Sequence, residues 1–178
     1  MASTDRDALV AMFHSTSGAG WKQKDNWETD ADLSLWSGVE VDYHGRVVTL
    51  RLKTESVQGT ITPELGKLAA LTTLNISFTG LTGHIPKELG CLTNLRSLHL
   101  FSNKLSGPIP KELGALTKLD DLNLSNTQLS GPIPRELGGL TKLRRLHLAS
   151  NRLSGPIPKE LGDLLKLNFL VLSGNELS

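Results

Sequence analysis

Residues 95–118, LRSLHLFSNKLSGPIPKELGALTK, form one copy of a 24-residue phrase that recurs along the chain. Further copies start at residues 71, 119, 143 and 167, and a weaker copy starts at residue 47. The copy that starts at 167 stops at Ser178, partway through the phrase. Self-similarity at a fixed period of roughly 20 to 50 residues predicts a repeat architecture, in which each copy is one structural unit.

The leucines of each copy indicate how the units pack. Apolar residues stand at relative positions 0, 3 and 5, as in Leu95, Leu98 and Leu100. The last two alternate with a polar residue, which is typical of a short strand with one buried face. Apolar residues then return at intervals of about four through the rest of the copy. One unit cannot bury all of them alone, so the units are predicted to stack into a solenoid whose strands form a parallel sheet.

The second half of the phrase predicts turns. Gly107 follows the strand region, where a bend with unusual backbone angles is expected. Pro110 has the fixed φ that starts a short helical turn over residues 111–113. Gly114 is expected to end that turn, as glycine does at helix C-termini. Asn103, at position 8, is expected to satisfy backbone groups at the bend.

Residues 1–46 precede the repeats and are predicted to cap them. Apolar residues at helical spacing predict a helix over residues 4–17. Alternation predicts a strand over residues 39–43, which forms a hairpin with the first repeat strand. The loop between them is either an aromatic ligand site or a cover for the open end of the core. We favour the cover, because an uncapped solenoid exposes its core. This loop holds all three tryptophans of the chain, Trp21, Trp27 and Trp36.

Composition argues against several classes of function. Nineteen basic and eighteen acidic residues leave a net charge of +1, which does not favour nucleic acid. No apolar run approaches the roughly 20 residues of a membrane span, and the charged start MASTDRDALVAMF does not fit a signal peptide. Cys91, the single cysteine, excludes an internal disulfide and is expected to be at least partly buried. No motif predicts a catalytic, cofactor-binding or metal site, so we do not expect an enzyme.

The phrase LxxLxLxxNxLSGxIPxELGxLxxL resembles the plant-specific class of leucine-rich repeats found in receptor kinases and inhibitor proteins. Residues 47–178 carry this resemblance, and the segment before them is similar to the cap that precedes such repeats. Secreted plant members have a cysteine pair around WxGV, where this chain has Ser34 and Val41. The cap is therefore more similar to those of algal, oomycete or bacterial proteins. The resemblance implies an α/β fold, a right-handed curved solenoid with a parallel concave sheet and short helical or 3-10 turns on the convex side.

The resemblance also implies a non-catalytic module that binds a protein, peptide or glycan on the concave sheet, in immune-type or signalling recognition. The alternative is a structural arm of a larger receptor, kinase or GTPase without a ligand of its own. Neither nucleic acid nor a membrane segment is expected. The charged start and the missing cysteine pair slightly favour a cytoplasmic location, and a removed signal peptide leaves an extracellular one open. The interrupted last copy indicates either a piece of a longer chain or an end-to-end dimer through that repeat.

Positions 1, 2, 4, 6 and 7 of each strand are free of the phrase and are expected to face the concave side or its rims. Five basic and two acidic residues at these positions give an expected charge of +3. Exposed aromatic side chains beside arginine are typical of binding hot spots, although ordinary surface variation is the simpler alternative. The candidate partner-binding residues are Arg51, Lys53, Phe78, Arg96, His99, Phe101, Asp121, Asn123, Arg145, His147 and Phe169.

Overall fold

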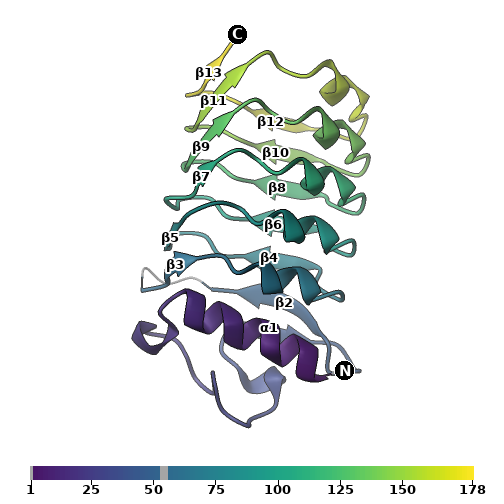
Figure 1. Cartoon of the computed structure of the whole chain (residues 1–178). Coiled ribbons are helices and arrows are strands. Elements are labelled where there is room, and N and C mark those ends of the chain that lie inside the picture. The colour runs from purple at the N-terminus through teal and green to yellow at the C-terminus, as the bar shows by residue number, and fades with distance from the viewer. Residues whose placement is uncertain (1, 53–55) are drawn as a thin grey trace.

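The computed structural model describes residues 2–52 and 56–178, which wind into a stack of coils (Figure 1). Among these residues, seven strands form one sheet in the order β1–β2–β4–β6–β8–β10–β12. β1 is antiparallel to β2, and the strands from β2 to β12 are parallel. The strands are β1 Val39–Val41, β2 Val47–Arg51, β4 Thr73–Asn75, β6 Ser97–His99, β8 Asp121–Asn123, β10 Arg145–His147 and β12 Phe169–Val171.

Equivalent residues of successive copies face one another across this sheet. Leu74 pairs with Leu98, and Leu98 pairs with Leu122, so the register advances by one copy per strand. These three leucines are fully buried, whereas the strand residues on either side of each one are partly exposed. The predicted alternation is confirmed. The outward residues form one continuous surface, which we call the concave face.

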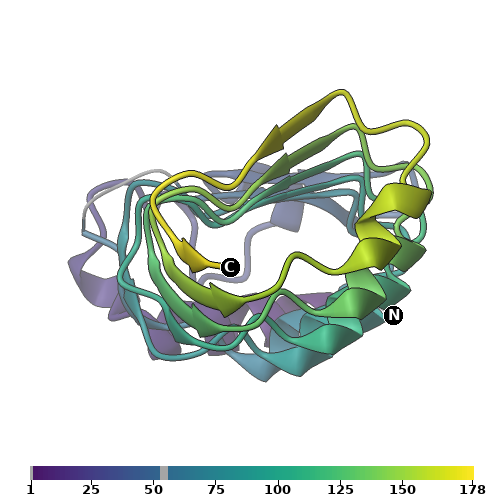
Figure 2. The ribbon, with the colours of Figure 1, turned by 90° about the horizontal axis from the view of Figure 1, so that it is seen from above.

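Short strands and 3-10 turns close each coil on the other side of the core. Seen from above the stack, the seven-stranded sheet runs along one side and the 3-10 turns along the opposite side (Figure 2). The predicted solenoid with a parallel sheet is confirmed. The short strands are β3 Gln58–Thr60, β5 Gly80–Thr82, β7 Ser106–Gly107, β9 Gln128–Gly131, β11 Arg152–Gly155 and β13 Glu176–Leu177. The 3-10 turns of the repeats are η3 Pro63–Lys67, η4 Lys87–Cys91, η5 Lys111–Ala115, η6 Arg135–Gly139 and η7 Lys159–Asp163.

The second glycine of the phrase lies inside the 3-10 turn and does not end it. In η5, Gly114 precedes the last residue of the turn and has no positive φ. A Cβ atom on Gly114 would lie 2.4 Å from the carbonyl oxygen of Glu136 in the next coil. Three equivalent glycines have the same contact at 2.4 to 2.5 Å. The expected turn-ending role is therefore wrong, and glycine is required because neighbouring coils approach so closely.

Cys91 follows this glycine in η4, and its side chain is exposed. The prediction that it is at least partly buried is wrong. The equivalent residues Ala115, Gly139 and Asp163 are also exposed, so this position lies on the outer side of the turn. It accepts residues of different size because these residues are exposed to solvent.

Asn103 is buried and satisfies backbone groups at the bend after β6, as the sequence predicts. Its Nδ2 donates to the carbonyl oxygens of Ile76, at 2.7 Å, and Leu100, at 2.9 Å. Its Oδ1 accepts from the N–H of Leu81 at 3.2 Å. One side chain therefore fastens three segments from two consecutive coils.

From residue 79 to residue 151, threonine alternates with asparagine at this position of the repeat, and each threonine bonds to the next asparagine. Thr79 Oγ1 donates to Asn103 Oδ1 at 2.5 Å, and Thr127 Oγ1 donates to Asn151 Oδ1 in the same way. Thr79, Asn103 and Asn151 are buried, and Thr127 is partly exposed. Threonine at this position therefore does not interrupt the hydrogen bonds between coils, because Thr79 and Thr127 each donate to the asparagine of the next coil.

The N-terminal helix α1, Ala2–Ser15, packs against η3 and covers the first coil. The predicted span of 4–17 is shifted by two residues at each end. Ser17 has a φ of 54°, in the left-handed region, which ends the helix before that residue. The hydroxyl of Thr16 donates to the carbonyl oxygen of Met12 at 2.5 Å and so closes the last turn.

The predicted strand over 39–43 is shorter in the structure, where β1 ends at Val41. The next residue, Asp42, accepts hydrogen bonds from the N–H groups of Arg46 and His44, both at 2.9 Å. These bonds turn the chain into β2, and they lower the pKa of the Asp42 carboxyl. The hairpin with the first repeat strand is present, with the turn starting earlier than the alternation indicates.

The three tryptophans of the cap are buried and pack together. The ring centroids of Trp21 and Trp27 are 4.8 Å apart, and those of Trp27 and Trp36 are 5.0 Å apart. Phe13 of α1 joins them, 5.2 Å from Trp21. The loop therefore covers the end of the leucine core and presents no aromatic surface to a ligand.

Asp5 joins the cap to the first repeat strand. Its side chain is 1% exposed, and it accepts hydrogen bonds from the N–H of Val47, at 2.9 Å, and from Arg46 Nε, at 3.2 Å. We expect Asp5→Ala to lower the free energy of unfolding by about 3 kcal/mol, because it leaves a buried N–H and a guanidinium without their acceptor. Urea unfolding followed by tryptophan fluorescence measures this loss. Asp7→Ala, an exposed aspartate of the same helix, is the matched control, and an equal loss in both variants would contradict the prediction.

Exposed apolar side chains gather near the C-terminal end of the stack, in the last copy and just before it. Leu165 is 93% exposed, Phe169 57% and Leu170 44%. Leu172 and Leu177 are only partly buried against the core. The end-to-end dimer through this repeat stays a prediction, and the size of the particle in solution tests it.

Candidate functional site

The concave face collects the predicted binding residues in straight columns. His99 pairs in register with Asn123, and Asn123 pairs with His147. Arg51, two strands before His99, stands at the start of the same column. A second column places Asp121, Arg145 and Phe169 in register. Lys53 lies outside the described residues.

Asp121 contacts His99 on one side and Arg145 on the other, so one carboxylate links side chains from three coils. Its Oδ2 atom lies 3.1 Å from His99 Nε2 on one side and 2.9 Å from Arg145 Nε on the other. The Asp121 side chain is 13% exposed, whereas the Arg145 side chain is 48% exposed, so the carboxylate is sheltered and the arginine reaches the solvent. The carboxylate fixes the orientation of His99 and Arg145 on the concave face.

The expected charge of +3 on this face leaves out one carboxylate, that of Glu40. Glu40 of β1 pairs across the sheet with Thr49, and its carboxylate lies 2.5 Å from Arg51 Nη1. The hydrogen bond from Thr49 and the ion pair with Arg51 lower the pKa of Glu40. Asp120 similarly holds Arg144 at 3.1 Å. Lys53, the fifth basic residue of the expected sum, lies outside the described residues. Over the four described arginines, Asp120 and Asp121 alone leave a charge of +2, and the Glu40 carboxylate lowers it to +1. The predicted hairpin could have indicated this carboxylate in the sequence, because pairing with β2 places the outward residues of β1 on the same face.

Phe78, Phe101 and His99 form the aromatic corner of the concave face. The rings of Phe78 and Phe101 meet edge to face with their centroids 4.9 Å apart. Phe101 lies 6.1 Å from His99 in a similar arrangement. Phe78 is 62% exposed, so a large apolar ring projects into solvent beside these partners. Such an exposed aromatic pair is typical of a binding surface.

Phe78 also has a backbone conformation that disfavours phenylalanine. Its φ is 56°, and its equivalents Ser102, Asn126, Ser150 and Gly174 have φ between 53° and 70°. Asparagine and glycine tolerate this left-handed region, whereas a bulky residue there is an outlier. The cost is of order 1 kcal/mol or more. Because the ring is largely exposed, it contributes little free energy to the stability of the fold.

We expect Phe78→Asn to change the free energy of unfolding by less than about 1 kcal/mol, because two effects oppose each other. The variant relieves backbone strain of about 1 kcal/mol, and it loses an edge-to-face contact worth about 0.5 to 1.5 kcal/mol. Asn126, with a φ of 53°, shows that asparagine fits this position. Thermal and urea unfolding measure the change, and a loss above about 2 kcal/mol would mean that Phe78 is a structural residue.

Two polar atoms near the aromatic corner lack partners within the described chain. Asn75 Oδ1, at the end of β4, and Ser77 Oγ, two residues later, are buried without a hydrogen bond to any described residue. Unpaired buried polar atoms are rare in native proteins and often mark functional positions. Nothing in the sequence could indicate this, because both residues fit the repeat.

The remaining predicted residues are spread over the face. Arg96 is exposed on β6's N-terminal side, and its carbonyl oxygen accepts from the N–H groups of Asp120 and Asp121. Asn123 and His147 are half-buried between the aromatic corner and Phe169. Phe169 lies in β12, three strands from Phe101's coil. The structure therefore joins Phe78, Phe101 and His99 and leaves Phe169 apart from them.

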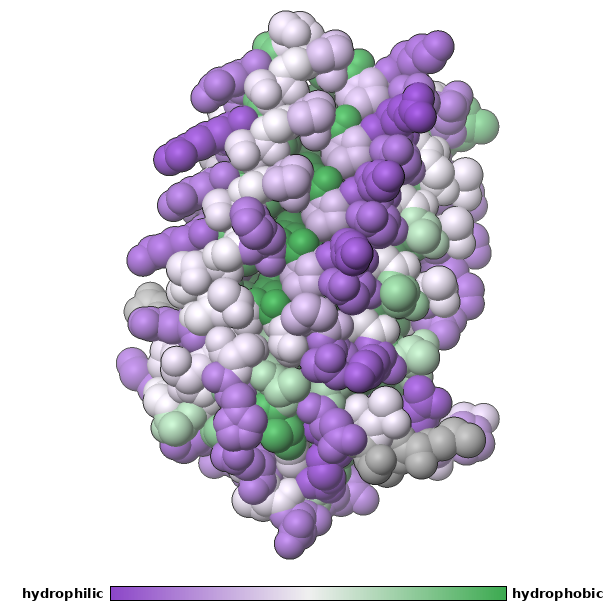
Figure 3. All heavy atoms as spheres, viewed as in Figure 1, coloured by the Kyte–Doolittle hydropathy of each residue, from purple (hydrophilic) through white to green (hydrophobic). Residues whose placement is uncertain are grey.

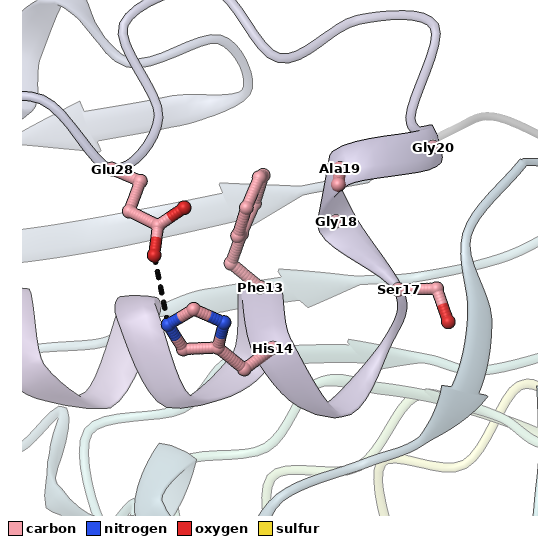
Figure 4. A pocket seen from close by; sticks show the side chains of 7 residues that line it. All are labelled: Phe13, His14, Ser17, Gly18, Ala19, Gly20 and Glu28. Atoms are coloured by element: carbon pink, nitrogen blue, oxygen red, sulfur yellow. Dashed lines mark ion pairs between the residues drawn. The ribbon is translucent and has the colours of Figure 1, made fainter.

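The cap contains a shallow pocket of about 430 Å³ near the end of α1. Figure 4 shows His14 Nε2 facing the carboxylate of Glu28, and these atoms are 2.9 Å apart. The hydroxyl of Ser17 points away from this pair (Figure 4). A serine, histidine and carboxylate are thus close in space but do not form a relay for nucleophilic catalysis, which requires the hydroxyl to bond the imidazole.

The side opposite the concave face is strongly hydrophilic. Charged and polar side chains form columns over the 3-10 turns and beside β7 to β11, with a narrow apolar strip between them (Figure 3). Arg135 and Glu136, two charged residues of η6, lie 3.8 Å apart. Within residues 2–52 and 56–178, no three histidine, cysteine or acidic side chains gather as a metal site requires. In the same ranges, no helix has the length and apolar character needed to cross a bilayer.

A family model described as a leucine-rich repeat region matches residues 34–178, which is most of the chain. The protein belongs to the leucine-rich-repeat family. No curated protein sequence matches this leucine-rich-repeat protein. Its structural neighbours include ectodomains of plant leucine-rich-repeat receptors, in agreement with the plant-type phrase.

Three solved structures illustrate the likeness. A plant ice-binding protein is 36% identical with a TM-score of 0.90, over 98% of this chain and 57% of that one. The ectodomain of the Arabidopsis thaliana receptor kinase GASSHO1/SCHENGEN3, in complex with CASPARIAN STRIP INTEGRITY FACTOR 2, is 38% identical with a TM-score of 0.93, over 97% and 21%. The Arabidopsis receptor kinase HAESA, in complex with the peptide hormone IDA and the co-receptor SERK1, is 30% identical with a TM-score of 0.73, over 96% and 33%. The leucine-rich-repeat protein thus spans 57% or less of each.

Proposed function

We propose that this leucine-rich-repeat protein is a non-catalytic recognition module that binds a peptide segment of a partner on its concave face. The aromatic corner is the anchor of that site. The observation that carries the proposal is Phe78, a ring 62% exposed on a backbone with a φ of 56°. A residue that is both strained and exposed stabilises the fold little, which fits a role in contacting a partner.

The surroundings of Phe78 suit a peptide better than a highly charged ligand. The ion pairs of Asp121 with Arg145 and of Glu40 with Arg51 leave the described part of the face close to neutral. Asn123 and His99 are partly exposed on this face, and amide and imidazole groups can hydrogen-bond the peptide backbone. HAESA, similar over 96% of this chain, was solved with a peptide hormone, which supports the same class of ligand here. The alternative of a structural arm does not account for the exposed aromatic corner.

Selection from a displayed library of random peptides tests the proposal. Binders are selected on the wild-type protein and then measured against Phe78→Asn and Phe101→Ala. We expect affinity to fall about tenfold or more in both variants, as for truncation of a hot-spot residue. Tyr43→Asn is the matched control, because Tyr43 is 92% exposed at the tip of the β1–β2 hairpin, and it should bind normally.

Two results would count against the proposal. One is a selection that yields no binders. The other is a set of binders whose affinities are the same for Phe78→Asn, Phe101→Ala and the wild type, since these peptides would use another surface. Circular dichroism of each variant establishes that it is folded before its affinity is compared.

Ice binding is a second candidate with one observation in its favour. Ser106, Ser130 and Ser154 place one small hydroxyl per coil on the outer face of β7, β9 and β11. Ice recognition requires a flat and regular array, and the register does not keep these serines together. Ser106 pairs with Gln128, and Ser130 pairs with Arg152, so long side chains stand between the hydroxyls. Inhibition of ice recrystallisation by the wild type, lost in Ser130→Lys, would favour this candidate.

A further inference from the structure

The concave face carries a second aromatic residue far from the aromatic corner. Phe169 is 57% exposed in β12, and Val171 lies on the same face two residues later. The equivalent residues in the other strands are polar, for example Asp121 and Asn123 in β8. The repeat therefore does not require apolar side chains at these positions.

The register places the two aromatic sites on a diagonal of the sheet. Phe169 is in register with Arg145, Asp121 and Ser97. Phe101 follows Ser97 by four residues on the same coil. With strands about 4.8 Å apart and about 3.3 Å per residue, the sites differ by about 14 Å across the strands and about 13 Å along them. The direct distance is then about 19 Å.

The line between the sites crosses polar residues that can hydrogen-bond a ligand. Asn123 of β8 and His147 of β10 are half-buried, outward-facing residues of the intervening strands. Both stand within about 2 Å of that line on the grid of strand positions. The charges beside it are neutralised, because Asp121 is held between His99 and Arg145. A ligand along this line meets hydrogen-bonding groups and little net charge.

We propose that the partner segment is an extended peptide that crosses the concave face diagonally, with one apolar side chain on Phe101 and a second on Phe169. An extended chain advances about 3.3 Å per residue, so the two apolar residues are about six positions apart. Polar, uncharged residues between them match Asn123 and His147. This inference rests on the proposed function and adds the spacing and polarity of the ligand to it.

A series of synthetic peptides tests the spacing. Each carries a fluorescent label and two leucines separated by two, four, six or eight positions in a serine and glycine background. Fluorescence anisotropy gives the dissociation constant of each peptide for the wild type, Phe101→Ala, Phe169→Ala and the double variant. We expect the six-position peptide to bind about tenfold more tightly than the two-position peptide, since only it reaches both anchors.

The variants separate this inference from the proposed function. Phe169→Ala should weaken the six-position peptide about tenfold and the two-position peptide less than twofold, whereas Phe101→Ala should weaken both. Binding that depends on Phe101 but neither on spacing nor on Phe169 would overturn the diagonal and leave the proposed function intact. If neither this series nor the peptides selected on the wild type bind the concave face, both ideas fail. Phe169→Leu keeps an apolar group and should retain most of the affinity.

Discussion

Asn103→Ala is expected to lower the free energy of unfolding by about 4 kcal/mol, one of the largest effects of any single substitution in this protein. The amide makes three bonds to the backbone, to Ile76, Leu100 and Leu81, and accepts a fourth from Thr79. The side chain is 7% exposed, so water does not readily replace the lost partner. Each buried group left without a partner costs about 1 to 3 kcal/mol, and partial relaxation reduces the sum.

Urea unfolding followed by circular dichroism measures this loss. Asn168→Ala is the control, because Asn168 is exposed and its replacement should change the free energy of unfolding by less than about 0.5 kcal/mol. Asn103→Thr tests whether the amide is needed or whether another polar side chain at this position is enough. Threonine occupies this position at Thr79 and Thr127, where it donates to the asparagine of the next coil. If Asn103→Thr is as stable as the wild type, the amide bonds are not what holds the bend.

The leucine core could be predicted almost completely from the sequence. Each buried leucine recurs at a fixed offset, and strand residues alternate between core and solvent with a period of two. Leu98 and Leu122 could therefore be assigned only to the core face of their strands. The structure places them in register on that face. The ends of the cap elements could not be predicted as well. They depend on local bonds, such as those of the Asp42 carboxylate, that compete with the alternation of Val39 to Tyr43.

The concave face was predictable in position and less so in charge. Period two assigns His99, Asn123 and His147 to one outward column, as the register shows. The pairing of Asp121 with both His99 and Arg145 depends on side-chain geometry that no pattern specifies. The strain at Phe78 did leave a signal. Asn126 and Gly174 occupy the same position, and both residue types are favoured at positive φ.

The close approach between neighbouring coils, as at Gly114 and Glu136, could not be predicted from the sequence. From the sequence alone, Gly114 could either end a short turn or allow another coil to pack closely. A turn-ending glycine typically has a positive φ, whereas a packing glycine does not need one. The structure decides for packing, because Gly114 has no positive φ and Glu136 of the next coil lies against it. The two roles also predict different effects of substitution. A turn-ending glycine is replaced at a cost in backbone strain, whereas a packing glycine is replaced at a cost in overlap.

Gly114→Ala should lower the free energy of unfolding by about 2 kcal/mol. The added Cβ would lie 2.4 Å from the Glu136 carbonyl oxygen and 2.8 Å from its Cβ, so two backbones have to separate. Overpacking of this kind costs about 3 kcal/mol, and the better turn propensity of alanine offsets at most about 1 kcal/mol. Urea unfolding of the variant and the wild type under identical conditions gives the difference.

Gly162→Ala is the matched control and should have the opposite sign. Gly162 holds the same position in η7 and also lacks a positive φ, but an added Cβ would meet nothing within 4 Å. Only the propensity term remains, so the variant should be unchanged or up to about 1 kcal/mol more stable. Equal destabilisation of Gly114→Ala and Gly162→Ala would show that the turn itself requires glycine. A loss of stability in Gly114→Ala without a loss in Gly162→Ala would show that glycine is required by the contact between coils. That contact is present at Gly114, and at Gly162 an added Cβ would meet no described atom within 4 Å.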